Sequence, residues 1–482
     1  MQTKLIIKDE VNVKFENLDL TTRRALVNKF KYQLPYARYL PAVRLGRWDG
    51  CVNYFNLGGT TYLNLLEEII PMLDERGYDI EIEDHRQGWH LEFDEVDENS
   101  VNFALWPTGH PAAGEPVTLR DYQVEAINSF LANPQSIQEL STGAGKTIMT
   151  ATLCYRAEKY GRTITIVPNK DLVRQTEKDY RLLGLDVGVY FGDRKEYGKT
   201  HTICTWQSLN SLGKKTKDGT AVVEWDEFVD GVNCVIVDEV HMSKADVLKS
   251  LLTGPFAHVP IRWGMTGTIP KEEAEWRSLQ VSLGNVTNRL KASDLQEQGV
   301  LAKCNVNIVQ IQDGREFSNY QAELKYLLTD TDRLDFMAKL ISKAAEEGNT
   351  LVLVDRIEAG KELITRLPGS VFISGEVKSN TRQEHYEEVS EAEGKIIVAT
   401  YGVAAVGINI PRIFNLVLVE PGKSFVRVIQ SIGRGIRKAE DKDAVEIWDI
   451  TSSCKFAKRH LTKRKQYYNE AKYPWVVEKV SI

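Results

Sequence analysis

The sequence predicts an α/β protein in which two tandem parallel-sheet domains follow a small α/β module. The main observation is that short apolar stretches alternate with helical stretches, as they do in consecutive βαβ units. One such series runs from residue 119 to about 266, and a second begins near residue 333. Only the first series contains a glycine-rich loop of the kind that binds phosphate. At 482 residues the chain is also too long for one hydrophobic core, so about three domains are expected.

The domain boundaries follow from changes in composition along the chain. The N-terminal module combines short alternating strands with amphipathic helical stretches. In the linker after it, an acidic run precedes several prolines and glycines. The last segment is basic and has a helical pattern. We therefore expect a module at 1–93, a linker at 94–117, a first parallel-sheet domain at 118–325, a second at 326–454 and a basic helical tail at 455–482.

The overall composition excludes several classes of protein. Hydrophobic residues make up 42% and charged residues 27%, which is ordinary for a soluble chain. No window offers the run of roughly 18 uncharged apolar residues that a membrane helix needs, and the N-terminus lacks the apolar core of a signal peptide. The six cysteines are scattered without a CxxC pair, which disfavours a zinc cluster or a disulfide framework. We expect a cytoplasmic protein with no membrane partner.

The charge is distributed unevenly. The net charge is −6, yet residues 21–47 hold seven basic residues and no acid. Residues 455–465 hold six basic residues and no acid, with three tyrosines nearby. Local basic faces of this kind can bind nucleic acid although the average charge is negative. For the tail, a solvated helix packed through Phe456 and Leu461 is an equally good interpretation.

Residues 140–147, Leu-Ser-Thr-Gly-Ala-Gly-Lys-Thr, form the predicted phosphate-binding loop. Its glycines can adopt backbone angles that turn successive N–H groups toward an anion, and the helix that follows adds its positive N-terminus. Lys146 would reach the outer phosphates, and the hydroxyl of Thr147 would ligate Mg²⁺. Leu140 stands where the general pattern has glycine, and a chance glycine-rich turn is the alternative. The residues expected to bind the nucleotide are Thr142, Gly143, Ala144, Gly145, Lys146 and Thr147.

Asp238 and Glu239 are the second candidate for chemistry. They follow the apolar strand 235–237, at the carboxyl edge where open α/β sheets place their sites. In an ATPase the first carboxylate holds Mg²⁺ and the second orients or activates the attacking water. An Asp-Glu pair is weak evidence alone, but downstream of a phosphate loop it indicates nucleotide hydrolysis.

The third candidate lies in the second domain, in Gln430-Ser-Ile-Gly-Arg434-Gly-Ile-Arg437. Arg434 and Arg437 are three residues apart, so on a helix they share a face. Guanidinium groups suit the charge of a transferring phosphoryl group. Arginines supplied by a second domain would couple hydrolysis to domain closure. The alternative is structural ion pairing on a helix.

In these elements the chain resembles the superfamily-2 helicases of the DExH type. Asp238-Glu-Val-His241 matches that family's second motif, and its other motifs follow in order from about residue 119 to 450. The resemblance implies two RecA-like domains with ATP and Mg²⁺ in the cleft between them. It also implies that Arg120 and Gln123 read adenine and that Gly407 lies in the ATP site. Asn409 departs from the Asp that many members carry. The implied catalytic residues are Lys146, Asp238, Glu239, Gln430, Arg434 and Arg437, and the implied Mg²⁺ ligands are Thr147 and Asp238.

The same resemblance implies contacts with nucleic acid. The family binds the strand backbone across the top of both domains, with little sequence preference. In the N-terminal module, Arg47 and Trp48 lie beside a turn, which suits phosphate contact and base stacking; a tryptophan that anchors the module's core is the equal alternative. The residues expected to contact nucleic acid are Arg47, Trp48, Pro168, Asn169, Arg174, Gln175, Trp206, Gln207 and Thr400.

Over its whole length the chain resembles the phage helicases of recombination and repair, in which a short N-terminal module precedes the two motor domains. That resemblance implies a monomeric DNA motor in the host cytoplasm. It would act on branched DNA such as forks, Holliday junctions and D-loops, and on RNA in R-loops. Two alternatives stay open: an RNA helicase or a duplex translocase without unwinding, and a nucleic-acid clamp switched by ATP.

Overall fold

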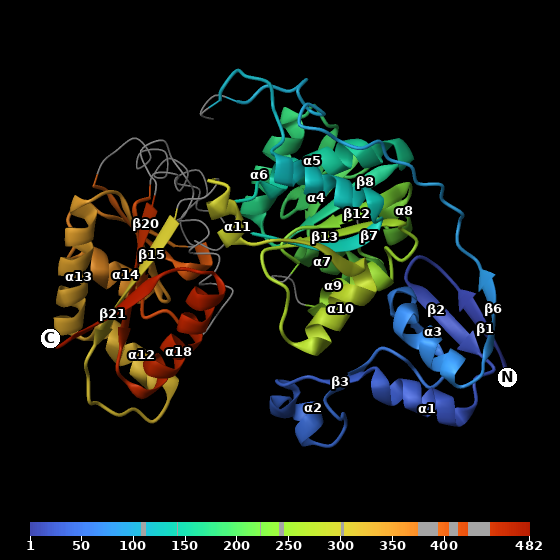
Figure 1. The fold of residues 1–482 in the computed structure, drawn as a ribbon, viewed down its shortest axis with the longest axis horizontal. Helices are drawn as coiled ribbons and strands as arrows, with labels where there is room; N and C mark the ends of the chain where they lie inside the picture. The colour runs from blue at the N-terminus through green and yellow to red at the C-terminus, as the bar shows by residue number, and fades with distance from the viewer. Residues whose placement is uncertain are drawn as a thin grey trace. The chain divides into compact units, whose positions relative to one another are not determined.

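A computed structural model describes residues 1–107, 112–141, 143–221, 223–240, 245–299, 303–374, 394–403, 413–422 and 444–482. The chain divides into two compact units, which we describe separately. The first comprises residues 1–140 and 145–289, and the second comprises residues 141–144 and 290–482. Each unit contains a large sheet covered by helices, in which neighbouring strands are mostly not consecutive in sequence (Figure 1).

The N-terminal module is built on a four-stranded sheet in the order β5-β2-β1-β6. Alternating residues of β1 and β2 are buried, as the apolar pattern predicts, and pack against α1 and α3. A two-stranded ribbon of β3 and β4 carries the short helices η1 and α2. The elements are β1 (Gln2–Ile7), β2 (Asn12–Glu16), α1 (Leu20–Lys29), β3 (Lys31–Gln33), η1 (Ala37–Tyr39), α2 (Pro41–Arg44), β4 (Cys51–Asn53), β5 (Thr60–Tyr62), η2 (Leu63–Leu65), α3 (Leu66–Glu75) and β6 (Asp79–Asp84).

The module packs directly against the first parallel-sheet domain, on helix α10 (Glu273–Leu283). The buried hydroxyl of Tyr54 donates to the carbonyl of Ala274 at 2.7 Å and lies 2.7 Å from Ser278 Oγ. Glu68 forms an ion pair with Arg277. The predicted linker therefore does not separate two independent bodies: residues 1–107 belong to the same compact unit as the domain that follows.

The first parallel-sheet domain has eight strands in the order β10-β9-β11-β8-β12-β13-β7-β14. Its central strands are buried along almost their whole length, which explains why their sequences are largely apolar runs without alternation. The strands are β7 (Gln135–Leu140), β8 (Arg162–Val167), β9 (Val187–Phe191), β10 (Arg194–Lys195), β11 (His201–Thr205), β12 (Val232–Val237), β13 (Ile261–Thr266) and β14 (Asn285–Leu290). The helices are α4 (Asp121–Ala132), α5 (Lys146–Ala157), η3 (Glu158–Tyr160), α6 (Lys170–Leu182), α7 (Trp206–Lys217), α8 (Trp225–Val229), α9 (Ala245–Thr253) and α10.

The second unit has a seven-stranded sheet in the order β17-β18-β16-β19-β20-β15-β21. The recorded strand pairs in it are parallel. Its strands are β15 (Lys303–Ile311), β16 (Thr350–Val354), β17 (Val371–Ile373), β18 (Ile396–Thr400), β19 (Asn415–Val419), β20 (Ala444–Ser452) and β21 (Trp475–Val480). Its described helices are α11 (Ala292–Glu297), α12 (Tyr320–Thr329), α13 (Thr331–Glu346), α14 (Ile357–Ile364) and α18 (Lys455–Glu470).

Two expected boundaries differ from the structure. The boundary at 325/326 is too late, because β15 pairs with β20 and β21 and so belongs to the second sheet. The C-terminal segment is not a free helical tail, because α18 packs on β20 and β21 adds a strand to the sheet. Leu461 of α18 is buried, as the packed-helix alternative expects. None of the helices in the described ranges is long and apolar enough to cross a membrane.

Candidate active site

The predicted phosphate loop follows β7 and leads into α5. Gly143 and Gly145 both have left-handed backbones, with φ of 91° and 78°. A Cβ atom at Gly145 would lie 2.5 Å from Nε2 of Gln123, so only glycine fits there. Gly145 is also the N-cap of α5 and supplies no side chain to cap the first turn. Leu140, the departure from the general pattern, is fully buried at the end of β7 and is accounted for by packing.

Lys146 is the first residue of α5, and its side chain crosses to the end of a neighbouring strand. Its Nζ lies 2.9 Å from Glu239 Oε1 and donates to the carbonyl of Leu140 at 3.2 Å. The side chains of both ion-pair partners are about nine-tenths buried. An ammonium group has three N–H donors, so these two contacts leave one donor for a phosphate oxygen.

Asp238 and Glu239 follow β12 at the carboxyl edge of the sheet, where the sequence predicts them. The backbone N–H of Asp238 donates to Ile166 on the neighbouring strand at 2.9 Å, which extends the ladder past the end of β12. Glu239 then turns out of the sheet with φ of 50°, a strained conformation for a residue with a side chain. Its N–H donates to Asp238 Oδ1 at 2.8 Å. The two carboxylates are only 4% and 8% exposed and, with Lys146, form one compact group.

The two residues that the family resemblance assigns to adenine lie at the start of α4. Gln123 Oε1 accepts from the backbone N–H of Arg120 at 2.9 Å, which caps the helix. Through its contact with Gly145, Gln123 lies against the phosphate loop. The Arg120 guanidinium is exposed and donates to Tyr122 Oη at 3.3 Å. The structure therefore brings Gln123, Lys146, Asp238 and Glu239 into one region.

No sequence pattern singles out Asp179, which lies on α6 beside the loop helix α5. Its side chain hydrogen-bonds to Thr147, the predicted Mg²⁺ ligand, and burial raises the pKa of Asp179 to about 6. The contact arises because α5 and α6 pack side by side. A spacing pattern cannot reveal such a contact, because 32 residues separate the two positions and nothing local links them.

Several predicted site residues lie outside the described part of the chain. This holds for one loop residue and for the residues assigned to the second domain's side of the ATP site. They are Thr142, Gly407, Gln430, Arg434 and Arg437. Their roles remain predictions.

Some of the residues assigned to nucleic acid come together at the start of α6. Asn169 caps this helix, with Oδ1 accepting from the N–H groups of Asp171 and Leu172 at 3.0 Å. Gln207, at the start of α7, donates to the carbonyl of Pro168 at 3.1 Å. The two helix starts are thus tied to each other at the carboxyl edge of the first sheet.

The remaining predicted contacts differ in exposure. Arg174 and Gln175 point outward from α6, whereas Trp206 is half-buried against the core of the domain. Thr400 ends β18 in the second unit. In the N-terminal module, Arg47 is exposed, but Trp48 is half-buried and donates from Nε1 to the carbonyl of Cys51 at 3.0 Å.

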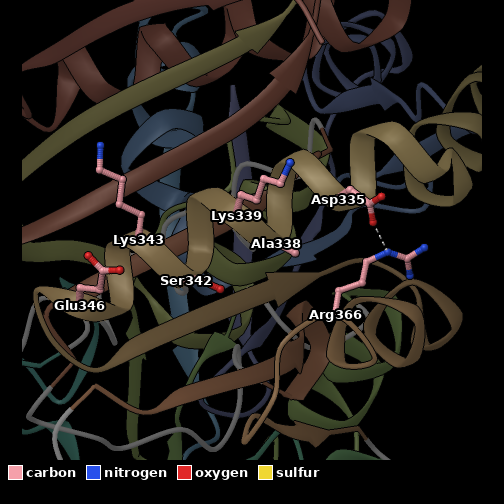
Figure 2. Close-up of a pocket in the computed structure, with 7 residues that line it drawn as sticks. All are labelled: Asp335, Ala338, Lys339, Ser342, Lys343, Glu346 and Arg366. Atoms are coloured by element: carbon pink, nitrogen blue, oxygen red, sulfur yellow. Dashed lines mark hydrogen bonds and ion pairs between the residues drawn. The ribbon is translucent and has the colours of Figure 1, made fainter.

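A separate surface hollow of about 700 Å³ lies along α13 of the second unit. Figure 2 shows Asp335 directed toward Arg366, with which it pairs at 2.7 Å. None of the predicted site residues lines this hollow. It consists mainly of exposed charged side chains of one helix, so it is not part of the site described above.

A buried lysine from a glycine loop, beside a strand-end Asp-Glu pair on a parallel sheet, defines a nucleotide hydrolase with tandem α/β domains. Two family models match the chain: "Type III restriction enzyme, res subunit" at residues 116–271 and "Helicase conserved C-terminal domain" at residues 332–439. The chain belongs to the superfamily-2 helicases, and it is an ATP-dependent enzyme with nucleic acid as its partner.

Individual relatives are similar over different shares of the chain. The ATP-dependent DNA helicase uvsW of Enterobacteria phage T4 is 25% identical over 97% of this chain and 94% of its own length. The DNA 3'-5' helicase XPB of Kineococcus radiotolerans is 25% identical over 74% of this chain and 64% of its own. Among solved structures, a fragment of a putative HsdR subunit of a type I restriction enzyme from Vibrio vulnificus YJ016 has the same fold. It has a TM-score of 0.56 and 16% identity, covering 98% of this chain and 84% of that one.

Proposed function

We propose that this chain is a DNA helicase or translocase that uses ATP to unwind or branch-migrate branched DNA. Forks, Holliday junctions, D-loops and R-loops are the expected substrates, and recombination and repair the expected processes. The observation that carries the proposal is the extent of the similarity to the phage DNA helicase uvsW. It covers 97% of the chain, including the N-terminal module, whereas the similarity to XPB covers 74%.

In the proposed reaction, Lys146 binds the outer phosphates of ATP while remaining beside Glu239. The ion pair of 2.9 Å supports this role, because it holds the ammonium at the mouth of the loop. Glu239 orients the attacking water or accepts its proton. Thr147 and Asp238 would hold Mg²⁺, which neutralises charge on the phosphates when bound. Two oxygen ligands of this kind, with water and phosphate completing the shell, suit that ion.

The second domain would complete the site. We propose that Gln430, Arg434 and Arg437 contact the transferring phosphoryl group and that Gly407 contacts the nucleotide. Because these residues come from the other RecA-like domain, hydrolysis would be coupled to domain closure. Arg120 and Gln123 would select adenine.

Nucleic acid would be held through its backbone by residues on both domains. The starts of α6 and α7, at Asn169 and Gln207, bring the positive ends of two helix dipoles to one edge of the sheet, which suits phosphate oxygens. Arg174 and Gln175 are exposed and able to reach a strand. For Trp206, half-buried in the domain core, a packing role accounts for the ring, and any strand contact would use its exposed edge.

A panel of substrates tests this function. We expect ATP turnover to be stimulated by DNA, and strand separation or branch migration to be fastest with forked DNA and Holliday junctions. Single-stranded DNA, plain duplex, RNA and RNA–DNA hybrids complete the panel. Stimulation by RNA alone would point to an RNA helicase, and turnover on duplex without product would point to a translocase. Binding that ATP switches without strand displacement would point to a clamp.

A further inference from the structure

Residues 34–50 form a small lobe that projects from the N-terminal module. The antiparallel ribbon of β3 and β4 closes its neck, where Gln33 pairs with Cys51 and Leu34 N donates to the carbonyl of Gly50 at 2.9 Å. The lobe itself holds η1 and α2 (Figure 1). Its chain therefore leaves the ribbon and returns to it within seventeen residues.

The lobe has a core of its own, which fixes its shape. Ala37 is buried, and Gly50 packs so closely that a Cβ there would lie 3.0 Å from the Ala37 Cβ. Trp48 packs into the same cluster, which also includes Ala274 of α10. Because the indole holds the lobe together and seats it on the motor domain, it is an anchor rather than a stacking platform.

The outer surface of the lobe is unusually apolar. Of the twelve large hydrophobic side chains that are exposed in the described residues, four lie between positions 36 and 45. The two most exposed are Leu45 at 64% and Tyr39 at 60%. Gly46, next to Leu45, has φ of 67° and no atom near its Cβ position, so this turn is the open tip of the lobe. Exposed apolar side chains concentrated on one small lobe are typical of a contact surface.

The charges on the lobe favour nucleic acid as the occupant. Arg38, Arg44 and Arg47 are exposed, and no ion pair is recorded for them within the described ranges. The Arg38 guanidinium lies over the Tyr39 ring, 4.7 Å from its centroid. The one acid of the lobe, Asp49, is paired with Lys31 at 2.7 Å. Unpaired arginines bind phosphates, and flanking apolar side chains stack on bases or wedge between them.

We propose that this lobe is a wedge that holds open the end of the duplex at a DNA branch point. Tyr39 and Leu45 contact the terminal base pair, and the three arginines hold the phosphates on either side. The inference rests on the proposed function, since it needs a motor that drives duplex against the lobe. It assigns strand separation to the N-terminal module and translocation to the two motor domains.

The test compares the Tyr39→Ser/Leu45→Ser protein with wild type and with Leu57→Ser. Leu57 is an equally apolar residue of the same module that is 50% exposed outside the lobe. We expect the double variant to keep ATP turnover on single-stranded DNA but to displace strands from a fork about tenfold more slowly, since loss of the Tyr39 stacking contact weakens binding by that order. A 2-aminopurine in the terminal base pair should brighten with wild type and Leu57→Ser and stay dim with the double variant.

The arginines are tested separately with Arg38→Gln/Arg44→Gln/Arg47→Gln and the matched control Arg24→Gln, an exposed arginine on α1. Fork affinity should fall, and the slope of log affinity against log salt should decrease by about 2 to 3. Point variants are preferable to deleting the module, which would strip Tyr54 from α10.

The outcomes separate this inference from the proposed function. If the double variant displaces strands and brightens 2-aminopurine as wild type does, the wedge is wrong and the apolar surface serves another occupant such as a protein. If wild type itself shows neither DNA-stimulated turnover nor strand displacement, the proposed function fails first.

Discussion

Each of the two large sheets ends a central strand in a buried glutamate with a left-handed backbone, and each glutamate is paired with a cation. In the first unit, Glu239 follows β12 with φ of 50° and pairs with Lys146. In the second unit, Glu420 follows β19 with φ of 41° and pairs with Arg333. The strand-end geometry is thus shared, although only the first unit carries a phosphate loop.

The difference lies in what surrounds each cation. Lys146 opens a helix whose N-cap is a glycine, so no side chain satisfies the first turn. Arg333 also lies in the first turn of its helix, α13. There, however, the Asp330 carboxylate caps the turn, because its Oδ1 accepts from the backbone N–H of Arg333 at 3.1 Å. An uncapped N-terminus attracts a phosphate, whereas a carboxylate-capped one repels it. The helix cap, rather than the ion pair, therefore distinguishes the strand end that we propose binds nucleotide from the one in the second unit.

Removing the cation of the first pair should have the largest effect. Lys146→Ala deletes the side chain that we propose contacts the outer phosphates, so we expect ATP turnover to fall by about a thousandfold. DNA binding without ATP should persist. Steady-state hydrolysis and DNA affinity are measured beside Lys178→Ala, an exposed lysine on α6. Turnover close to wild type would overturn the assignment of the loop.

Glu239→Gln should lower turnover by about a hundredfold, because an amide cannot accept a proton from water. ATP binding should remain, because Lys146 is unchanged. The affinity for ATP should therefore stay close to that of wild type while the rate of hydrolysis falls. The exposed Glu272→Gln is the matched control. An equal loss of ATP affinity and of turnover would show that Glu239 holds the loop rather than the water.

The features predicted correctly are those encoded locally. The glycine loop and the strand-end carboxylates depend on residues adjacent in sequence, and the buried strands on continuous apolar runs. These features led to the predicted fold class and family, and the family matches confirm both predictions. Each of these features can be recognised without knowing which other part of the chain packs against it.

What the sequence could not provide is the partner of each buried side chain. Arg464 belonged to a basic stretch expected to be either a phosphate-binding tail or a solvated face. Instead it is 3% exposed and pairs with Asp449 through both oxygens, at 2.8 and 2.9 Å. In the same way, the hydroxyl of Tyr54 lies within hydrogen-bonding distance of Ser278, which is 224 residues away in sequence. Periodicity tells which face is buried but not against which element.

Arg333→Ala should destabilise the second unit by about 3–5 kcal/mol, because it removes the cation that is hydrogen-bonded to the buried Glu420. Urea unfolding of the full chain should show the transition of one unit shifted and the other unchanged. Lys339→Ala, on the exposed face of the same helix, is the control and should shift neither by more than about 0.5 kcal/mol. If both variants unfold like wild type, the Glu420–Arg333 pair contributes nothing to the stability of this unit.

The ion pair of the second unit should also make stability depend on pH. Burial, opposed by Arg333 and Arg464, raises the pKa of Glu420 from 4.5 to about 7. The folded state therefore binds a proton that the unfolded state has lost, so the free energy of unfolding falls as pH rises from about 4.5 to 7. The shift corresponds to a change on the order of 3 kcal/mol.

Glu420→Gln should abolish that slope in urea unfolding between pH 5 and 8. Loss of the ion pair also changes the free energy of unfolding by an amount that is constant above pH 7. The measurement therefore compares the slopes of stability against pH, not the absolute stabilities. Glu358→Gln, an exposed carboxyl on α14, should keep the wild-type slope. If Glu420→Gln keeps it too, Glu420 is ionised in the folded chain at pH 5. Burial would then not have raised the pKa of this carboxyl, and the pair at β19 would be fully charged at that pH.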